Sequence, residues 1–352
     1  MTSLPIQHSR FEFILMRAWA RRGWLAWMLL PAAWLFRILT LLRRSLYAAG
    51  LLRTTRLPVP VIVVGNIFVG GTGKTPLTIW LVDALRQAGY APGVVSRGYG
   101  AASDRPRAVN ADSIAQHAGD EPVLIARRTH VPVMVGRDRA AAAQALLAIY
   151  PKVNVIVSDD GLQHYALWRD IEIVLFDDRG VGNGWVLPAG PLREPVSRRR
   201  DFTVVNAAHV PPYDGDHPVR MALIGEFAER LSDASQKIPL SAMQAMQRSG
   251  SPSGKIVAAA GIGNPARFFG MLRNAGLKFD AMPLPDHYDF SINPFAGLHA
   301  DMILITEKDA VKCRAIEALE TDPRLWVVPV TARIDGALAQ QIVEKLRGHP
   351  TA

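Results

Sequence analysis

The sequence predicts an α/β protein made of two units, each with a mostly parallel sheet covered by helices, and an N-terminal helical arm. Three observations support this prediction. A glycine-dense loop within VIVVGNIFVGGTGKTPL, residues 61–77, separates an apolar β-branched run from a helical pattern. Short apolar runs alternate with helical segments through most of the chain, which is typical of parallel sheets. The first 56 residues are instead rich in arginine and tryptophan.

Length, charge and cysteine content narrow the class of protein. A chain of 352 residues suits two domains and an extension. Its single cysteine, Cys313, excludes an internal disulfide and a cysteine-rich metal site, and is typical of a reducing cytoplasm. The net charge is +9, but residues 1–56 contain nine arginines and one acid, so the other 296 residues carry only about +1. We therefore expect no nucleic-acid partner.

The arm, residues 1–56, has the pattern of helices at a membrane surface. The segment from Phe11 to Arg22 has the pattern of an amphipathic helix, because Arg10, Arg17 and Arg21 align at helical spacing while aromatic side chains fall on another face. Gly23–Phe36 has no charge, but Pro31 and Arg37 disfavour a spanning helix. We expect two helices that lie in or dip into the interface of an anionic membrane. A hydrophobic hairpin buried in the fold is the alternative, whereas no convincing secretory cleavage site follows.

The glycine-dense loop predicts a nucleotide site of the P-loop type, and with it a P-loop NTPase-type α/β/α domain. Glycines let backbone N–H groups approach phosphate, the helix N-terminus adds partial positive charge, and Lys74 can reach the β- and γ-phosphates. Phe68 stands where a glycine is usual, and a glycine-rich turn without a ligand is the alternative. The candidate nucleotide-binding residues are Gly70, Gly71, Thr72, Gly73, Lys74 and Thr75, of which the last can also ligate Mg²⁺.

Alternating strands and helices predict the rest of the first unit. Helices are expected at 76–89 and 138–149, and strands at 91–96, 131–136, 153–158, 171–176 and 202–206. The glycine-rich segment 96–100 follows a strand, at the edge where open α/β sheets build their sites. Asp120 and Glu121 begin a helix that reaches about Thr129, so either acid is a candidate N-cap as well as a candidate site residue.

Two strand ends have paired aspartates that fit a metal site. The strand at 153–158 ends in Asp159-Asp160, and the strand at 171–176 ends in Asp177-Asp178. A carboxylate at this position can hold Mg²⁺ opposite the P-loop threonine. The pattern alone does not separate the two pairs, but the segment 162–164 adds Gln and His at the first. We therefore favour Asp159 and Asp160.

The remaining chain predicts a second, smaller α/β/α unit. Residues 183–200 form a proline-rich loop in which Arg193 is a candidate phosphate clamp, and 207–254 are weakly patterned. Strands are expected at 256–261, 302–306 and 326–330. One helix is expected to open at 263–265 and to end at about 274, a second to follow 307–309, and a third to occupy 335–347. The predicted organisation is a membrane-docking arm at 1–56, a P-loop domain at 57–210, a connection at 211–254 and a C-terminal α/β domain at 255–352.

Eight ordered blocks resemble one known family. They are VGNIFVGGTGKTP (64–76), SRGYG (96–100), GDEP (119–122), DDGLQH (159–164), LPAGPLREP (187–195), AGIGNPARFF (260–269), DHYDF (286–290) and TEKDAVK (306–312). By these blocks the chain resembles the tetraacyldisaccharide 4′-kinases, the lipid A kinases of Gram-negative bacteria, over nearly its whole length. The departure at Phe68 agrees with that family's own form of the loop.

The resemblance implies ATP-dependent phosphorylation, with Mg²⁺, of the 4′-hydroxyl of a tetraacylated glucosamine disaccharide 1-phosphate in lipid A biosynthesis. It also implies two α/β/α units with the site between them. The location implied is the cytoplasmic face of the bacterial inner membrane, where the arm docks on the anionic surface. No obligate protein partner is evident.

The resemblance further implies roles for individual residues. Asp120, with His287 behind it, resembles the base that accepts the proton of the sugar hydroxyl, and Lys74 resembles the lysine that holds the phosphates. The implied metal ligands are Thr75, Asp159 and Asp160, and the candidate substrate or phosphate contacts are Arg97, Gln163 and Arg193.

Two other classes of protein compete with a lipid kinase. A membrane-recruited P-loop ATPase that switches a partner is the main alternative, but such ATPases usually have a signature lysine where this chain has Val69. ATP turnover that needs no lipid and rises steeply with protein concentration would favour it. A structural membrane protein with a vestigial loop is the third class, and it predicts that Lys74→Ala changes only stability.

Overall fold

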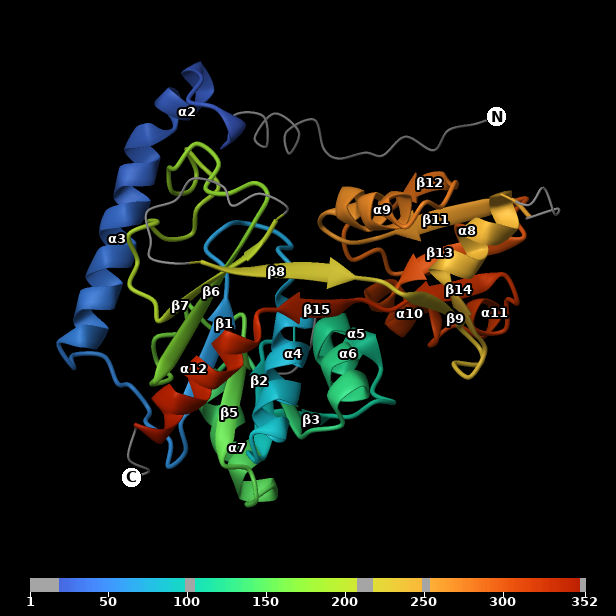
Figure 1. Cartoon of the computed structure of the whole chain (residues 1–352). Coiled ribbons are helices and arrows are strands. Elements are labelled where there is room, and N and C mark those ends of the chain that lie inside the picture. Colours follow the sequence, from blue (N-terminus) through green and yellow to red (C-terminus); the bar gives the residue numbers. More distant parts are fainter. Residues whose placement is uncertain (1–18, 99–104, 208–217, 249–253, 349–352) are drawn as a thin grey trace.

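The computed structural model describes residues 19–98, 105–207, 218–248 and 254–348. Within these ranges the chain folds into two lobes, each built on a mostly parallel sheet, and a helical arm (Figure 1). The α/β prediction is confirmed. Most of the helix expected from Phe11 to Arg22, and Tyr99 and Gly100 of the SRGYG block, lie outside the described residues.

The first lobe contains a nine-stranded sheet with the order β15-β8-β7-β6-β1-β5-β2-β4-β3. Its strands are β1 (Val61–Gly65), β2 (Pro92–Ser96), β3 (Arg107–Val109), β4 (Val133–Val135), β5 (Val155–Asp159), β6 (Ile171–Asp177), β7 (Phe202–Asn206), β8 (Val219–Ile224) and β15 (Thr331–Ile334). Its helices are α4 (Lys74–Gln87), α5 (Ala115–Ala118), α6 (Asp120–Thr129), α7 (Arg139–Ile149) and α12 (Gly336–Arg347).

The centre of this sheet forms because its strands are apolar and β-branched. Strand β1 is buried along its whole length and pairs in parallel with β5 and β6. Its alternate side chains enter two separate hydrophobic clusters, with Ile62 and Val64 in one and Val61 and Val63 in the other. A strand buried on both faces reads as a continuous apolar run, which is why the sequence identified it.

The second lobe contains a six-stranded sheet with the order β10-β9-β14-β13-β11-β12. Its strands are β9 (Phe227–Arg230), β10 (Lys237–Pro239), β11 (Ile256–Ala260), β12 (Asp280–Pro283), β13 (Met302–Thr306) and β14 (Leu325–Val328). Its helices are α8 (Leu240–Arg248), α9 (Pro265–Asn274), α10 (Glu307–Cys313) and α11 (Glu317–Glu320).

The strand pairing corrects the predicted division of the chain after residue 210. The region 211–254 is more than a connection, because it contains β8 of the first sheet and β9, β10 and α8 of the second lobe. The predicted unit 255–352 does not stay together, since β15 pairs antiparallel with β8. Helix α12 also buries Leu338, Ile342 and Leu346 in the core of the first lobe.

Two short connections therefore join the lobes, one between β8 and β9 and one between β14 and β15. In Figure 1, β8 and β15 extend side by side from the first lobe toward the second. Gly225 lies in the first connection, where an added Cβ would come within 2.9 Å of Cε of Met271. This close packing holds the connection against α9.

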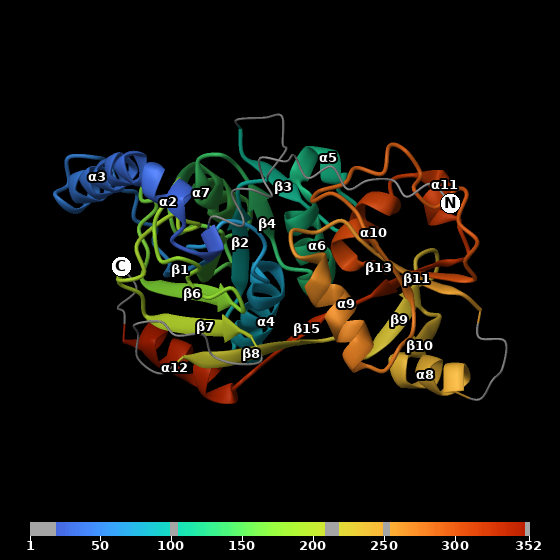
Figure 2. The same cartoon turned by 90° about the horizontal axis from the view of Figure 1, so that it is seen from above.

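The arm forms α2 (Trp24–Met28) and α3 (Leu30–Ala48) along the side of the first lobe away from the second (Figure 1, Figure 2). Only Ala26 and Ala33 are buried within these two helices. The structure thus differs from the alternative of a buried hairpin. Among the described residues, no helix is long and apolar enough to cross a membrane. The exposed apolar side chains of the arm are Trp24, Trp27, Met28, Trp34, Leu35, Ile38, Leu39, Leu41, Leu42 and Leu51.

Aromatic contacts fix the arm to the loop at 183–192. Trp27 packs edge to face on Trp185, with 5.0 Å between ring centroids, and the guanidinium of Arg22 lies over the same ring. Farther along α3, Tyr47 lies 5.9 Å from the ring of Tyr165. The arm is therefore attached to the segments that border the pocket described below.

Candidate active site

Strand β1 and helix α4 place the P-loop, residues 66–73, at the carboxyl edge of the first sheet. Gly70 and Gly73 adopt φ values of +98° and +99°, which an L side chain rarely does. A Cβ on Gly73 would also lie 2.7 Å from Nδ2 of Asn206. The buried Nζ of Lys74 donates to Oδ1 of Asn66 at 3.2 Å and lies 3.6 Å from Oδ1 of Asp160. The loop thus has the shape and charge of a phosphate site.

The pair Asp159-Asp160 at the end of β5 faces this loop. Oδ1 of Asp159 accepts a hydrogen bond of 2.9 Å from Thr78, which lies on α4 one turn after Thr75. Burial, followed by the nearby charges of Glu121 and Asp160, raises the pKa of Asp159 to about 7. Burial alone would raise the pKa of Asp160 too, but Lys74 and two arginines outweigh it and lower that pKa.

The free oxygens of this pair fit a cation. Within the described part of the chain, Oδ2 of Asp159 and Oδ1 of Asp160 are buried and accept no hydrogen bond. No cluster of three His, Cys, Asp or Glu side chains occurs among those residues. Mg²⁺ usually takes one or two carboxylates and completes its shell with water and phosphate oxygens, so two aspartates beside a P-loop suffice.

The rival pair Asp177-Asp178 has other partners. Asp177 is fully buried and receives hydrogen bonds of 2.7–3.1 Å from Arg179. Oδ1 of Asp178 accepts a hydrogen bond of 2.7 Å from Arg267 of the second lobe. Two guanidiniums therefore neutralise this pair, whereas Asp159 keeps a free oxygen. This difference supports Asp159 and Asp160 as the candidate metal ligands, a choice that the sequence pattern alone does not decide.

Asp120 begins α6, and His287 reaches it from the second lobe. Oδ2 of Asp120 lies 3.1 Å from Nδ1 of His287. Burial alone would raise the pKa of Asp120, but the His287 hydrogen bond, Lys308 and Lys312 outweigh it and hold that pKa well below its usual range. The same hydrogen bond raises the pKa of His287 above its ordinary value of 6.5. The two side chains form one titrating pair.

Two lysines of α10 strengthen the contact between the lobes at this point. Nζ of Lys308 donates to Oε1 of Glu121 at 2.6 Å, and Nζ of Lys312 lies 3.8 Å from Oδ2 of Asp120. The nearby charge of Lys308 is the largest effect on Glu121 and lowers its pKa. Both lysines belong to the TEKDAVK block, but no pattern in the sequence places that block opposite α6.

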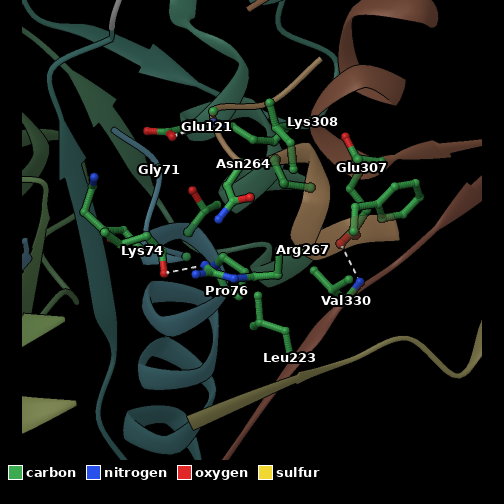
Figure 3. A pocket seen from close by; sticks show the side chains of 18 of the residues that line it. Gly71, Lys74, Pro76, Glu121, Leu223, Asn264, Arg267, Glu307, Lys308 and Val330 are labelled. Atoms are coloured by element: carbon green, nitrogen blue, oxygen red, sulfur yellow. Dashed lines mark hydrogen bonds and ion pairs between the residues drawn. The ribbon is translucent and has the colours of Figure 1, made fainter. Parts of the chain in front are cut away.

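Two pockets adjoin at Glu121, which lines both. The first has a volume of about 160 Å³ and lies between the P-loop and the second lobe. Figure 3 shows its labelled side chains converging from both lobes, with Lys74 and Glu121 on one side and Asn264 and Lys308 on the other. Its apolar walls include Ile79, Leu124, Leu223, Ile262, Phe268 and Val328. The sequence had left this part of the site unassigned.

The second pocket, of about 480 Å³, lies on the other side of Glu121 and is rich in arginine. It contains Asp120, Asp160 and all three predicted substrate contacts, Arg97, Gln163 and Arg193. The sequence did not identify the lining arginines Arg43, Arg137 and Arg139 as site residues, and it indicated His164 only as an added polar group at the first aspartate pair.

The neighbours of this second pocket set its charge. Nη1 of Arg193 lies 3.6 Å from Oδ2 of Asp160, and Gln163 donates to Glu194 at 2.8 Å. Burial, followed by the charge of Arg139, lowers the pKa of His164 to about 4, so this side chain is neutral at pH 7. The pocket's cationic groups are therefore its arginines, and guanidiniums suit phosphate.

The geometry places a phosphate loop, a carboxylate pair and a basic pocket around one point, and the chain matches one family model over most of its length. The model, described as tetraacyldisaccharide-1-P 4′-kinase, matches residues 25–347. The chain belongs to the tetraacyldisaccharide-1-P 4′-kinase family. The family expected from the sequence blocks is thereby confirmed.

Individual relatives of the 4′-kinase family extend over the same length. A tetraacyldisaccharide 4′-kinase of Janthinobacterium sp. (strain Marseille) is 63% identical over 349 residues, with 99% of this chain and all of the relative covered. One of Herminiimonas arsenicoxydans is 61% identical, with 99% of each chain covered. The crystal structure of LpxK from Aquifex aeolicus in complex with ATP is 30% identical, with a TM-score of 0.73, 92% of this chain covered and 99% of that one.

Proposed function

We propose that this chain transfers the γ-phosphate of ATP to the 4′-hydroxyl of a tetraacylated glucosamine disaccharide 1-phosphate, a step of lipid A biosynthesis. The observation that supports this most directly is the meeting of two pockets at Asp120 and Glu121. One pocket contains the P-loop and the other contains five arginines. A reaction that joins a nucleotide phosphate to an anionic acceptor needs such a pair of adjoining sites.

The first pocket is the proposed site of ATP. The P-loop backbone and Lys74 would bind the phosphates. The apolar walls that both lobes contribute suit a flat base, and Asn264 at the pocket supplies a side chain that both donates and accepts hydrogen bonds. Because the second lobe forms part of the wall, ATP would bind between the lobes rather than on the first lobe alone.

Thr75, Asp159 and Asp160 are the proposed holders of Mg²⁺. The ion, when bound, neutralises negative charge on the phosphates and on the oxygen that leaves. The chain's own contribution is to keep Oδ2 of Asp159 and Oδ1 of Asp160 without a hydrogen bond and to keep Nζ of Lys74 3.6 Å from the second of these oxygens. Thr78 holds Asp159 by one oxygen only, so its second oxygen stays available.

Asp120 and His287 are the proposed proton acceptor. A carboxylate whose pKa is held low is a weak base, so its first task is to accept the hydrogen bond of the sugar hydroxyl and orient it. Phosphoryl transfer passes through a loose transition state in which the hydroxyl proton leaves late. Asp120 then accepts that proton, while the Nδ1–H of His287 keeps its hydrogen bond to Oδ2 and holds the carboxylate in place.

The arginines of the second pocket are the proposed contacts for the acceptor's phosphate. Arg97 and Arg193 lie in the same pocket as Asp120. Arg43 reaches this pocket from α3, so the arm and the acceptor site are neighbours. A headgroup held there would be close to the helix that we expect to contact its acyl chains.

The arm is the proposed membrane-docking element, at the cytoplasmic face of the bacterial inner membrane. Its exposed tryptophans and leucines alternate with arginines, as in helices that bind anionic interfaces. Replacing Leu35 and Leu39 with Glu should abolish sedimentation with anionic vesicles, whereas Ile292→Glu, at an even more exposed apolar residue of the second lobe, should not. Equal vesicle binding by both variants would contradict this role.

The decisive test is transfer of labelled phosphate. Purified protein is incubated with γ-labelled ATP, Mg²⁺ and a tetraacyldisaccharide 1-phosphate in detergent micelles. Label in the lipid that disappears with Lys74→Ala supports the proposal. Release of free phosphate at the same rate with and without the lipid would favour the switch ATPase instead.

A further inference from the structure

Side chains hold the backbone carbonyls of the P-loop along its glycine-rich part. The backbone carbonyls of residues 68–72 all accept hydrogen bonds from side-chain donors. Asn66 donates to the carbonyls of Phe68 and Gly70, Arg179 to those of Val69 and Gly71, and Asn206 and Arg267 to that of Thr72, at distances of 2.7–3.4 Å. Each of these five carbonyls therefore has at least one side-chain donor.

These bonds decide where the loop's N–H groups point. The C=O and N–H of one peptide plane face opposite ways, so a fixed carbonyl fixes the direction of the next residue's N–H. The glycines would otherwise allow many orientations, since they restrict the backbone least. The four donors are therefore part of the phosphate site, and one of them, Arg267, also lines the P-loop pocket.

Arg267 is the donor that comes from the second lobe. Its Nη1 donates to the carbonyl of Thr72 at 3.1 Å, and its Nη2 donates to Oδ1 of Asp178 at 2.7 Å and lies 3.2 Å from Oδ2 of Asp177. Figure 3 shows the side chain extending toward the start of α4. Only the planar fork of an arginine can make both contacts at once. Among the described donors, the other three belong to the first lobe.

The aspartates at the end of β6 thereby acquire a function. Asp177 is fully buried and pairs with Arg179, which holds the carbonyls of Val69 and Gly71. Asp178 pairs with Arg267. The aspartate pair that resembles a metal site in sequence is the counter-charge for the two guanidiniums that hold the loop.

A second contact between the lobes lies at the same place. An added Cβ on Gly263, which precedes α9, would come within 3.1 Å of the backbone N of Gly71. The segment 263–267 therefore packs directly on the P-loop. Any displacement of the second lobe would move Arg267 away from Thr72 and leave the loop's last carbonyl with Asn206 alone.

We propose that Arg267 is a positioning residue that, paired with Asp178, aligns the P-loop from the second lobe and makes the ATP affinity of the first lobe depend on the second. By linkage, ATP bound to the aligned loop stabilises the contact between the lobes to the same degree. Loss of the fork contact should weaken ATP binding by roughly 10- to 100-fold, within the usual span of such couplings.

The test compares Arg267→Met, Arg267→Lys, Asp178→Asn and the double variant Arg267→Met/Asp178→Asn. Arg273→Met is the matched control, because Arg273 is exposed on the same helix and only lies over the ring of Phe279. Two quantities are measured, the Kd for ATP by calorimetry and the amide hydrogen exchange of residues 69–73 without nucleotide. Thermal unfolding shows that each variant is folded.

The proposal predicts a distinct pattern. Both Arg267 variants should weaken ATP binding to a similar degree and speed exchange in the nucleotide-free loop. Asp178→Asn should have a smaller effect of about two- to fivefold, since Asp178 is largely exposed, and no effect when Arg267 is already absent. Arg273→Met should match the wild type in both measurements.

Three results would overturn the proposal. Weak ATP binding with unchanged exchange in the nucleotide-free protein would mean that Arg267 contacts the nucleotide itself. Rescue of ATP binding by Arg267→Lys would mean that charge alone matters. Additive effects of the Arg267 and Asp178 changes would mean that the two do not act together. Because both readouts concern the nucleotide site, they are independent of the acceptor's identity.

Discussion

Asp120→Asn is the substitution that most directly examines the proposed chemistry. Asparagine keeps the size and one oxygen acceptor of the side chain but removes its charge and its ability to take a proton. The side chain is 8% exposed, and its Oδ2 lies 3.1 Å from His287 and 3.8 Å from Lys312. Lys312 keeps Asp309 as a partner at 3.5 Å, so we expect the protein to fold.

The expected loss in kcat is roughly 10²–10⁴-fold, which is the usual contribution of a positioned general base. This corresponds to about 3–6 kcal/mol in the activation free energy, at about 1.4 kcal/mol for each factor of ten. His287→Ala should cost less, roughly 10- to 100-fold, because it leaves the carboxylate but releases its orientation. The double variant should be no slower than Asp120→Asn, since the pair acts as a unit.

The measurement is steady-state transfer of labelled phosphate, with KM determined separately for ATP and for the lipid. Asp120 lines the acceptor pocket and not the P-loop pocket, so the ATP dissociation constant should stay close to that of the wild type. Near-normal turnover of Asp120→Asn would refute the base assignment. A loss of ATP affinity as large as the loss of turnover would refute the division of the site into two pockets.

Three further predictions follow from the same contacts. Asp159→Asn should raise the Mg²⁺ concentration needed for half-maximal rate, whereas Asp178→Asn, measured at saturating ATP, should shift that concentration much less; equal shifts in titrations of rate against Mg²⁺ would contradict the metal assignment. The pKa of His287 is raised on folding, so its stabilising contact with Asp120 is fully present below the ordinary value of 6.5 and is lost above the raised value. The difference in Tm between wild type and His287→Gln should therefore be larger at about pH 5.5 than at about pH 9, and a difference that grows with pH would contradict the pair. Arg43→Ala should raise KM for the disaccharide 1-phosphate by up to about tenfold and have little effect with an acceptor that lacks the phosphate. Arg37→Ala, on the same helix but outside the pocket, is the control, and equal effects of both changes would indicate that only membrane charge matters.

The sequence predicted those parts of the fold that are determined locally. Strand β7 at 202–206 and helix α9 at 265–274 have the predicted limits, because an apolar run and a proline at the helix start identify them without reference to the rest of the chain. The P-loop could also be predicted from local sequence, because its backbone adopts positive φ angles at positions where the chain has glycine. In each case the signal lies within a dozen residues.

The sequence could not predict the elements whose place depends on distant partners. Strand β8 is only partly buried and has no clear alternation, so nothing marked it as an edge of the first sheet. Strand β15 joins that sheet through pairing with β8, across more than a hundred residues. The division of the chain into two consecutive units was wrong for this reason.

The site shows the same division between local and distant information. Asp159 and Asp160 were recognised by their position after an apolar strand. The sequence separates this pair from Asp177 and Asp178 only weakly. The structural reason for the difference is an ion pair of Asp178 with Arg267, which lies 89 residues away in the chain. Ion pairs between lobes leave no periodic trace in the sequence.

The charge balance of the acceptor pocket explains why the protein needs both its arm and its second lobe. The transfer brings an anionic lipid up to a polyphosphate, and like charges at such short range repel strongly. Five arginines line the pocket against three carboxylates, Asp120, Glu121 and Asp160, so the lining has a net excess of two positive charges.

The carboxylates at this junction need partners of their own. Lys308 and Lys312 from the second lobe compensate Glu121 and Asp120, so the arginines of the pocket need not neutralise these two carboxylates. Arg43 adds one of those arginines from the helix that we expect to lie at the membrane. A single lobe with the same P-loop would bind a nucleotide, but its acidic residues at the start of α6 would be uncompensated and would repel the lipid's phosphate.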